Sequence, residues 1–243
     1  MFGEVAEQYD AERPSYPDEV FDTIIEYGGL RPGDAALEIG AGTGKATKGF
    51  VDRGLVVHAL EPSAGMARVL RTKGFEVEET SFENWPVRTS AFRLVFAAQA
   101  WHWVHGADRF EKVAAALHPG GTVAMFWNIG RDHPEPFKTD NDALYDELVP
   151  GFNRAIGSRA KPDLLVRDFA RAEFEPIVER KITWRTSYTS AEWIRVLGTH
   201  SDHRMLPDDV RTKLHTGIGR VIDEHGGRLV ATYDVMLYLA TRR

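Results

Sequence analysis

Short apolar runs alternate with helical patterns through the first half of the chain. The apolar runs are continuous, as expected for strands whose sheet is covered on both faces. They occupy residues 36–39, 55–60, 75–79, 94–97 and 122–127. The helical patterns lie near residues 18–27, 45–53, 64–73 and 107–117. This alternation predicts an α/β fold: a doubly wound, mostly parallel sheet with helices on both faces.

The pattern is less regular after residue 128. Residues 130–136 are polar and contain two prolines, which predicts a loop. Helical patterns follow at 138–149, 191–197 and 208–225, and strand patterns at 175–185 and 229–239. We therefore expect one domain, with a helical insertion between its last two strands.

The run ALEIGAGTGKAT at residues 36–47 is the most informative segment. An apolar strand ends in an acid and turns through three alternate glycines into a helix, and such a bare turn suits a nucleoside ligand. A dinucleotide site would need glycine or alanine where Lys45 stands. A phosphate-binding P-loop would need glycine at Ile39 and serine or threonine at Ala46. Both standard patterns are therefore absent.

Composition excludes some chemistry. The apolar share of 43% and the charged share of 27% are ordinary for a globular protein. A net charge of −6 argues against a nucleic-acid partner, and the lack of cysteine excludes disulfides, thiolate metal sites and thiol nucleophiles. No run approaches the roughly 20 apolar residues of a membrane helix, and the first residues lack a signal-peptide pattern. We expect a cytoplasmic protein without membrane contact.

Polar residues follow the predicted strands at the edge where α/β sheets bind ligands. Glu61 ends the second strand, at a distance from the first glycine suited to hydrogen bonds with a ribose diol. Residues 81–83 follow the third strand, residues 99–103 follow the fourth, and Asn128 ends the fifth. We expect these groups to surround one ligand.

These residues resemble the class I S-adenosylmethionine-dependent methyltransferases, in the small-molecule branch called type 11. The resemblance covers nearly the whole chain. EIGAGTG at 38–44 is similar to the first motif of the family, and LEPSAGM at 60–66 to the second. AQAWHW at 98–103 and AEQYDAERPSYP at 6–17 resemble the segment after the fourth strand and the N-terminal lid of one subset.

The resemblance implies a Rossmann-like seven-stranded sheet with an antiparallel last strand. It divides the domain of residues 1–243 into a lid (1–17), a cofactor-binding core (18–128), and cap helices with the last two strands (129–243). S-adenosylmethionine is the implied cofactor and a small molecule the implied partner. The cofactor-binding residues implied are Tyr9, Arg13, Glu38, Gly40, Ala41, Gly42, Gly44, Glu61, Pro62, Met66, Phe82, Glu83, Ala98 and Gln99.

The methyl acceptor leaves fewer signals. His102 is the preferred general base, since imidazole titrates near neutral pH. A hydroxyl acceptor would need such a base and a carboxylate acceptor would not, and Arg13 or Arg204 could hold a substrate carboxylate. The residues expected to bind substrate are Tyr16, Trp101, Trp103, Asn128 and Arg204.

Two local geometries remain open. If residues 101–103 are extended, both indoles share one face and the imidazole takes the other. The pair His200 and His203 lacks a nearby third ligand, so we expect no metal site and place this segment in the cap near the pocket.

Three functions are compatible with the sequence. The first is methyl transfer to a small molecule, with O-methylation of a hydroxyl or carboxylate expected. The second is a non-catalytic S-adenosylmethionine-binding module. The third is a nicotinamide-dependent oxidoreductase, which the glycine spacing and Lys45 disfavour.

Overall fold

The computed structural model describes residues 6–152, 169, 172 and 174–243. Residues 1–5 of the expected lid lie outside this range. The described strands form a seven-stranded sheet in the order β3-β2-β1-β4-β5-β7-β6. Neighbours from β3 to β5 are parallel, and β7 is antiparallel to both β5 and β6. The predicted α/β fold with an antiparallel last strand is confirmed.

The strand bounds are β1 Ala35–Ile39, β2 Val56–Leu60, β3 Val77–Glu78, β4 Phe92–Ala98, β5 Leu117–Gly130, β6 Val178–Thr189 and β7 Arg228–Thr241. The largest differences from the sequence prediction concern β3, β5 and β6. β3 pairs only with β2 at the sheet edge and is short. β5 begins earlier, where Leu117 pairs with Phe92 of β4, and both β5 and β6 end later because each pairs with the long β7.

Helices cover both faces of the sheet because its strands are apolar on both sides. On one face, Phe21 of α2 (Asp18–Gly28) and Phe50 of α3 (Lys45–Val51) pack with Phe96 of β4. On the other face, Phe110 and Val113 of α5 (Arg109–Ala116) join a second buried cluster. α4 (Ala64–Thr72) borders β3 at the edge.

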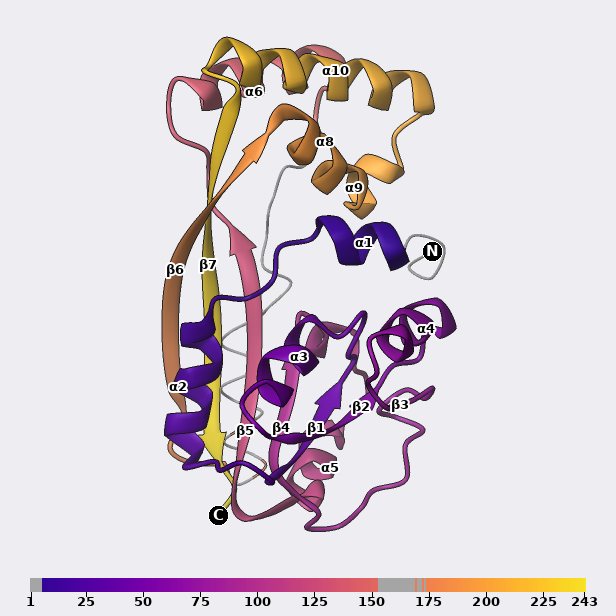
Figure 1. Cartoon of the computed structure of the whole chain (residues 1–243), viewed down its shortest axis with the longest axis vertical. Helices are drawn as coiled ribbons and strands as arrows, with labels where there is room; N and C mark the ends of the chain where they lie inside the picture. Colours follow the sequence, from indigo (N-terminus) through magenta and orange to yellow (C-terminus); the bar gives the residue numbers. More distant parts are fainter. Residues whose placement is uncertain (1–5, 153–168, 170–171, 173) are drawn as a thin grey trace.

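Four helices form a separate layer, the cap, beyond the ends of the long strands β5, β6 and β7 (Figure 1). They are α6 Phe137–Leu148, α8 Ser190–Gly198, α9 Ser201–Arg204 and α10 Asp208–Glu224. The cap has its own apolar cluster, with Leu214 and Ile218 of α10 at its centre. A capping box between Thr189 and Glu192 starts α8 directly at the end of β6. Three of the helices form the expected insertion between the last two strands, and α6 precedes β6.

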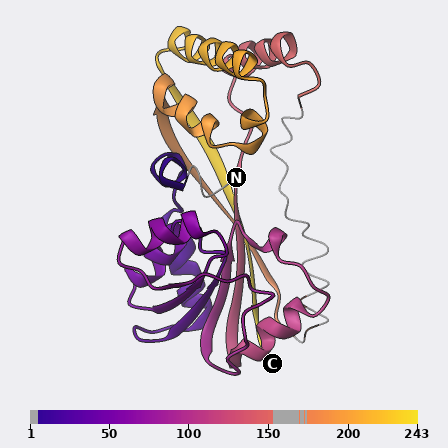
Figure 2. The same ribbon diagram turned by 90° about the vertical axis from the view of Figure 1, so that its right-hand side faces the viewer.

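The lid helix α1 (Ala6–Glu12) lies between the core and the cap (Figures 1 and 2). On the core side, Asp10 accepts a hydrogen bond from Lys73 at 2.5 Å, and its carbonyl accepts one from Lys45 at 2.6 Å. Toward the cap, Glu12 pairs with Arg195 of α8 at 2.7 Å. The lid is therefore tied to both layers.

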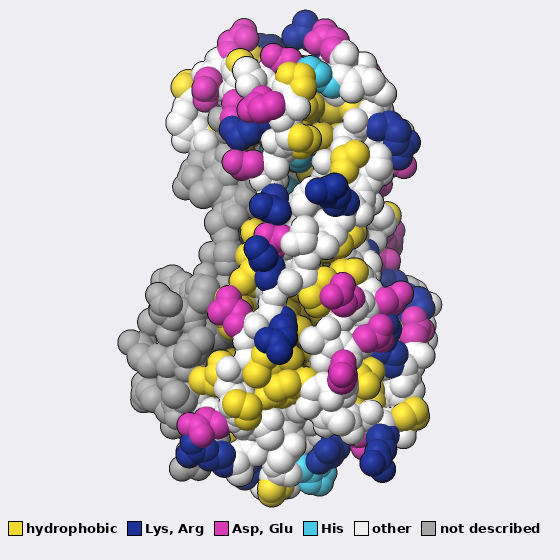
Figure 3. All heavy atoms as spheres, turned by 90° about the vertical axis from the view of Figure 1, so that its left-hand side faces the viewer, with side chains coloured by type: hydrophobic (Ala, Val, Ile, Leu, Met, Phe, Trp, Pro, Cys, Tyr) yellow, Lys and Arg dark blue, Asp and Glu magenta, His cyan; other side chains and the backbone are white. Residues whose placement is uncertain are grey.

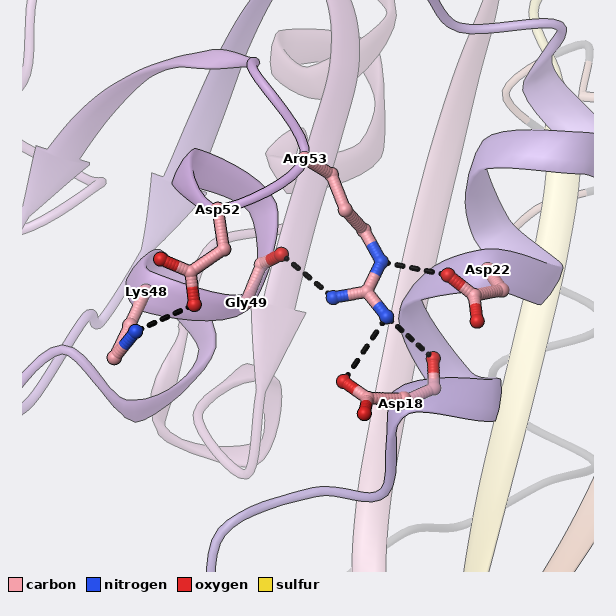
Figure 4. A network of polar contacts seen from close by, with 6 residues as sticks. All are labelled: Asp18, Asp22, Lys48, Gly49, Asp52 and Arg53. Carbon is pink, nitrogen blue, oxygen red and sulfur yellow. Dashed lines mark hydrogen bonds and ion pairs between the residues drawn. The ribbon is translucent and has the colours of Figure 1, made fainter.

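Polar contacts of Arg53 attach α2 to the end of α3, the helix that follows the glycine loop (Figure 4). The Arg53 guanidinium donates to Asp22 at 2.6 Å, to Asp18 at 3.0 Å and to the Gly49 carbonyl at 3.1 Å. It also lies over the Phe21 ring, 5.0 Å from its centroid. These contacts hold the end of α3 against α2.

β6 is an edge strand whose unpaired side carries charge. Arg180, Lys181 and Arg185 are exposed along it, and Figure 3 shows Lys and Arg side chains on this face of the molecule. Charged side chains on an edge strand oppose pairing with another chain. Within the described part of the chain, no helix is long and apolar enough to cross a membrane.

Candidate active site

A cavity of about 800 Å³ lies between the ends of the parallel strands, the lid and the cap. Its wall begins at the glycine loop after β1 and continues to the cap helices. The residues expected from the sequence that line it are Tyr9, Arg13, Tyr16, Gly40, Ala41, Gly42, Glu61, Pro62, Met66, Phe82, Glu83, Ala98, Gln99, Trp103 and Asn128. The strand ends therefore meet as expected for an α/β sheet.

The three loop glycines have different roles. All have positive φ angles, which L side chains rarely adopt. A Cβ on Gly40 would lie 2.6 Å from the Ala100 Cβ, and one on Gly44 would lie 2.2 Å from Leu70. A Cβ on Gly42 would meet nothing within 4 Å, and Gly42 lines the cavity. Gly40 and Gly44 are thus required by packing, and Gly42 leaves room beside the loop.

Glu61 joins the glycine loop to the end of β2. One carboxylate oxygen accepts a hydrogen bond from the Gly42 N–H and the other from the Ser63 N–H, both at 2.8 Å. Burial raises the pKa of Glu61, and these N–H groups oppose the rise. Each oxygen keeps acceptor capacity for a ligand, because a carboxylate accepts about four hydrogen bonds.

Glu38 lies beneath the loop, outside the cavity wall. It is 1% exposed and accepts a hydrogen bond from the Thr47 hydroxyl at 2.5 Å. Burial raises its pKa to about 8; the Thr47 hydrogen bond opposes the rise and the nearby Glu61 adds to it. In this position Glu38 supports the loop and makes no described contact with the cavity.

The loop fits the cofactor that the resemblance implies. Thr43 lines the cavity, and its hydroxyl is buried beside the Asp10 carboxylate. Together with the open space beside Gly42 and the Glu61 carboxylate, it offers polar contacts for a nucleoside with a free ribose diol. The side chains of Met66 and Phe82 supply buried apolar wall at this end.

The end of β4 is held by an unusual backbone. Gln99 has a φ of +57°, in the left-handed region that non-glycine residues seldom occupy. Its side-chain amide donates to the Asn128 carbonyl at 2.7 Å. The Asn128 side chain in turn accepts from the Trp184 indole at 3.0 Å. Strained residues of this kind cluster at functional sites, and here the strain positions the ends of β4 and β5.

The structure decides the open geometry of residues 101–103. They form a 3₁₀ turn, so the condition of an extended segment is not met. Trp101 is 2% exposed and packs on Phe110 in the core, whereas Trp103 is 51% exposed at the cavity wall. The turn separates the two indoles, so the expected substrate role of Trp101 is not supported.

His102 is also absent from the cavity wall. Its Nδ1 accepts a hydrogen bond from the Trp127 indole at 3.1 Å. A neutral imidazole that accepts at Nδ1 carries its proton on Nε2, so its basic nitrogen is already engaged. This geometry argues against the general-base role. Arg204, the last residue of α9, is likewise outside the cavity wall.

The cap contributes cavity residues that no motif indicated. They come from α6, α8, the turn before α9, α9 itself and β7: Asn141, Tyr145, Trp193, His200, His203 and Tyr233. We call this part of the wall the cap side, and the part formed by residues 40–43, 61–63 and 66 the loop side. The two histidines lie near the pocket as expected. Tyr145 and Trp193 could be found only as aromatic residues within amphipathic helices, a pattern shared with any core. Asn141 and Tyr233 carried no signal of their own.

A hydrogen-bonded chain crosses the cap from the cavity. The Tyr145 hydroxyl lies 3.0 Å from Nε2 of His203, and Nδ1 of His203 lies 3.0 Å from Nε2 of His215. Burial lowers the pKa of His203 and His215, and burial together with Arg13 lowers that of His200 far below its usual range. These histidines are neutral at pH 7.

Known proteins are similar to this chain in sequence. The family model described as a methyltransferase domain matches residues 37–125. An uncharacterized methyltransferase of Mycobacterium tuberculosis is 30% identical over 228 residues, which cover 92% of this chain and 86% of the relative. A relative in Schizosaccharomyces pombe, also an uncharacterized methyltransferase, is 23% identical over 217 residues, 88% of this chain and 84% of its own length.

Solved structures agree with this fold. A type II methyltransferase candidate from Anaeromyxobacter dehalogenans matches with a TM-score of 0.67 and 21% identity, over 94% of this chain and 97% of that one. Phosphoethanolamine N-methyltransferase 2 of Haemonchus contortus, solved with S-adenosylhomocysteine, has a TM-score of 0.59 and 14% identity; the match covers 99% of this chain and 57% of that one. The chain belongs to the methyltransferase family, within which its first two motifs resemble the class I S-adenosylmethionine-dependent enzymes.

Proposed function

We propose that this methyltransferase methylates an oxygen atom of a small molecule held on the cap side of the cavity. The observation that carries the proposal is the continuity of the cavity, because one space is lined both by the glycine loop and by the cap. A cofactor on the loop side and an acceptor on the cap side would then meet inside it. In this proposal the chain works as one cytoplasmic domain of lid, core and cap, without a nucleic-acid partner.

The residues of the loop side would hold the cofactor. Glu61 would accept hydrogen bonds from its ribose, and Gly42 and Thr43 would border its amino-acid part. When bound, S-adenosylmethionine supplies an electrophilic methyl group on a sulfonium.

The contribution of the protein is then mainly positional. A near-attack geometry supplies roughly 7–11 kcal/mol. Tyr9 and Arg13 of the lid segment line the cavity and would help to exclude water, which strengthens electrostatic interactions inside it.

An oxygen acceptor agrees with the polar groups of the cap side. The buried Tyr145 and Tyr233 and the neutral His200 offer hydrogen bonds around an apolar wall. The fold alone does not select the attacked atom. Its solved neighbours include an N-methyltransferase and a geranyl diphosphate C-methyltransferase of Streptomyces coelicolor, the latter with a TM-score of 0.52 and 13% identity.

Methyl transfer from isotope-labelled S-adenosylmethionine tests the proposal. The acceptors would be matched panels of carboxylic acids, phenols, alcohols and amines, with products identified by mass spectrometry. Base treatment separates the oxygen products, since methyl esters release labelled methanol and methyl ethers do not. We expect label on oxygen, and a Trp193→Ala variant should lose turnover while keeping cofactor affinity. Label on nitrogen or carbon would contradict the proposal, and cofactor binding without turnover would favour the non-catalytic alternative.

A further inference from the structure

Arg13 is a cation inside the cavity whose hydrogen-bonding capacity is largely unused. It follows α1, where the lid meets the cap. Its Nε is buried without a hydrogen-bond partner. One terminal nitrogen donates to the Thr199 carbonyl at a long 3.4 Å, and the guanidinium lies 5.5 Å from the centroid of the Tyr9 ring. A buried donor left unpaired destabilises the protein, so its position calls for a ligand.

The other cations of the cavity wall are already paired. Lys45 contacts Asp10, Lys138 pairs with Asp142 at 2.6 Å, and Arg131 lies 3.6 Å from Asp234. No described carboxylate lies within ion-pair distance of Arg13. Its charge is therefore the uncompensated positive charge in the described wall.

The surroundings of Arg13 belong to the cap side. Its contact Thr199 ends α8, and its charge acts on His200, Tyr188 and Tyr233. Burial raises the pKa of Tyr233 and of Tyr16, and the Arg13 charge opposes both rises. Near Arg13, these tyrosines and His200 are uncharged at pH 7, so one positive charge faces neutral aromatic groups.

We infer that Arg13 binds a carboxylate of the methyl acceptor, and that the acceptors are organic acids with an apolar body. The inference rests on the proposed function, because it assigns the cap side to the acceptor. An arginine binds a carboxylate through two parallel hydrogen bonds, which fixes orientation as well as charge. Trp193 and Phe152 line the same wall and fit the apolar part. An acid methylated on its carboxylate needs no general base, in agreement with the engaged Nδ1 of His102.

The competing assignment is that Arg13 binds the carboxylate of the cofactor, as the resemblance implies. Two compounds related to the cofactor distinguish these assignments. S-adenosylhomocysteine has the amino-acid carboxylate and 5′-methylthioadenosine lacks it. Titration calorimetry with both compounds on the wild type, Arg13→Gln and Arg13→Lys therefore measures any contact of Arg13 with the cofactor. We expect both affinities to stay within about twofold in Arg13→Gln.

Acid binding is then measured on the protein saturated with S-adenosylhomocysteine. The probes are benzoate and phenylacetate, with benzamide and phenylacetamide as neutral controls. We expect the wild type to prefer the acids, Arg13→Gln to lose at least tenfold in acid affinity, and Arg13→Lys to recover part of it. Arg131→Gln, which removes a paired cation of the same wall, should leave acid affinity unchanged.

Several results would overturn the inference. One is a loss of S-adenosylhomocysteine affinity in Arg13→Gln with 5′-methylthioadenosine unchanged, because Arg13 would then serve the cofactor. Others are equal binding of acids and amides, or no binding of either acid by the wild type. Failure of the proposed function is distinct: Arg13-dependent acid binding with label found on nitrogen or carbon would contradict O-methylation and leave the Arg13 assignment intact.

Discussion

The two sides of the cavity are built in different ways. The loop side comes from a short stretch after β1 and the end of β2, and much of its surface is backbone supported by Glu61. The cap side is made of side chains from three helices, one turn and β7. A backbone site depends on a few residues with special conformations, whereas a side-chain site can vary at every position. The difference explains how a family can keep its cofactor and change its acceptor.

The core and the cap also bury opposite kinds of titratable group. The core buries Glu38 with a raised pKa, and the cap buries His200, His203 and His215 with lowered pKa values. Burial favours the neutral form in both cases. Core and cap should therefore lose stability at opposite ends of the pH range.

The largest expected effect concerns Glu38. Its folded pKa of about 8 exceeds its ordinary 4.5, so its stabilising contribution is complete below pH 4.5 and is lost as the pH rises through 8. Against Glu38→Gln, which cannot ionise, the wild type should lose about 5 kcal/mol of unfolding free energy between pH 4.5 and 9. Denaturant unfolding of the cofactor-free proteins measures this. If the free energy of unfolding changed with pH in the same way in both proteins, Glu38 would not be the cause of the alkaline loss of stability.

Glu61→Gln, a change on the loop side, should weaken cofactor binding, whereas a change on the cap side should not. A glutamine can accept from only one of the two backbone N–H groups of Gly42 and Ser63 and loses the charge. The cost of an unpaired buried group is about 1–3 kcal/mol, so S-adenosylhomocysteine affinity should fall roughly 10- to 100-fold. Calorimetry measures it, with the cap variant Trp193→Ala as the control that keeps full affinity. Equal losses in both variants would show that the sides are not independent.

Acid should destabilise the cap first. The lowered pKa of His203 means that its contribution is complete above the ordinary value near 6.5 and is lost as the pH falls through the folded value. Each unit of lowering corresponds to about 1.4 kcal/mol. Amide hydrogen exchange, corrected for the intrinsic effect of pH, measures this loss. Between pH 7 and pH 5, protection should fall more in α8–α10 than in β1 and β4.

His203→Gln should reduce that acid dependence, although it removes the hydrogen bonds to Tyr145 and His215. His118→Gln, at an exposed position of β5, is the matched control and should change nothing. If cap and core lost protection equally at low pH in the wild type, the claim that acid destabilises the cap first would be wrong.

The smallest expected effect lies on the surface of the core. Arg53→Lys replaces a guanidinium that joins Asp18, Asp22 and Gly49 by a single ammonium (Figure 4). Exposed ion pairs contribute at most about 1 kcal/mol, so the free energy of unfolding should fall by that amount or less. S-adenosylhomocysteine affinity should not change. A tenfold loss of affinity would mean that the position of α3 controls the glycine loop more strongly than the buried packing does.

The sequence determined the α/β order of elements, the loop glycines and Glu61. These follow from local rules, because apolar periodicity depends on neighbours along the chain and positive φ angles select glycine. The same rules predicted an extended segment as one option for residues 101–103, and the 3₁₀ turn that places Trp101 in the core was not visible in them.

Only the tertiary structure decided the cap side of the cavity. Arg13 meets Thr199 across 186 positions, and Tyr145 meets His203 across 58. Such contacts depend on how the lid and the cap pack, and no spacing along the chain records them. The engagement of His102 by Trp127 has the same origin. Local backbone chemistry therefore allowed the loop side to be predicted from the sequence, whereas long-range packing of side chains shaped the cap side.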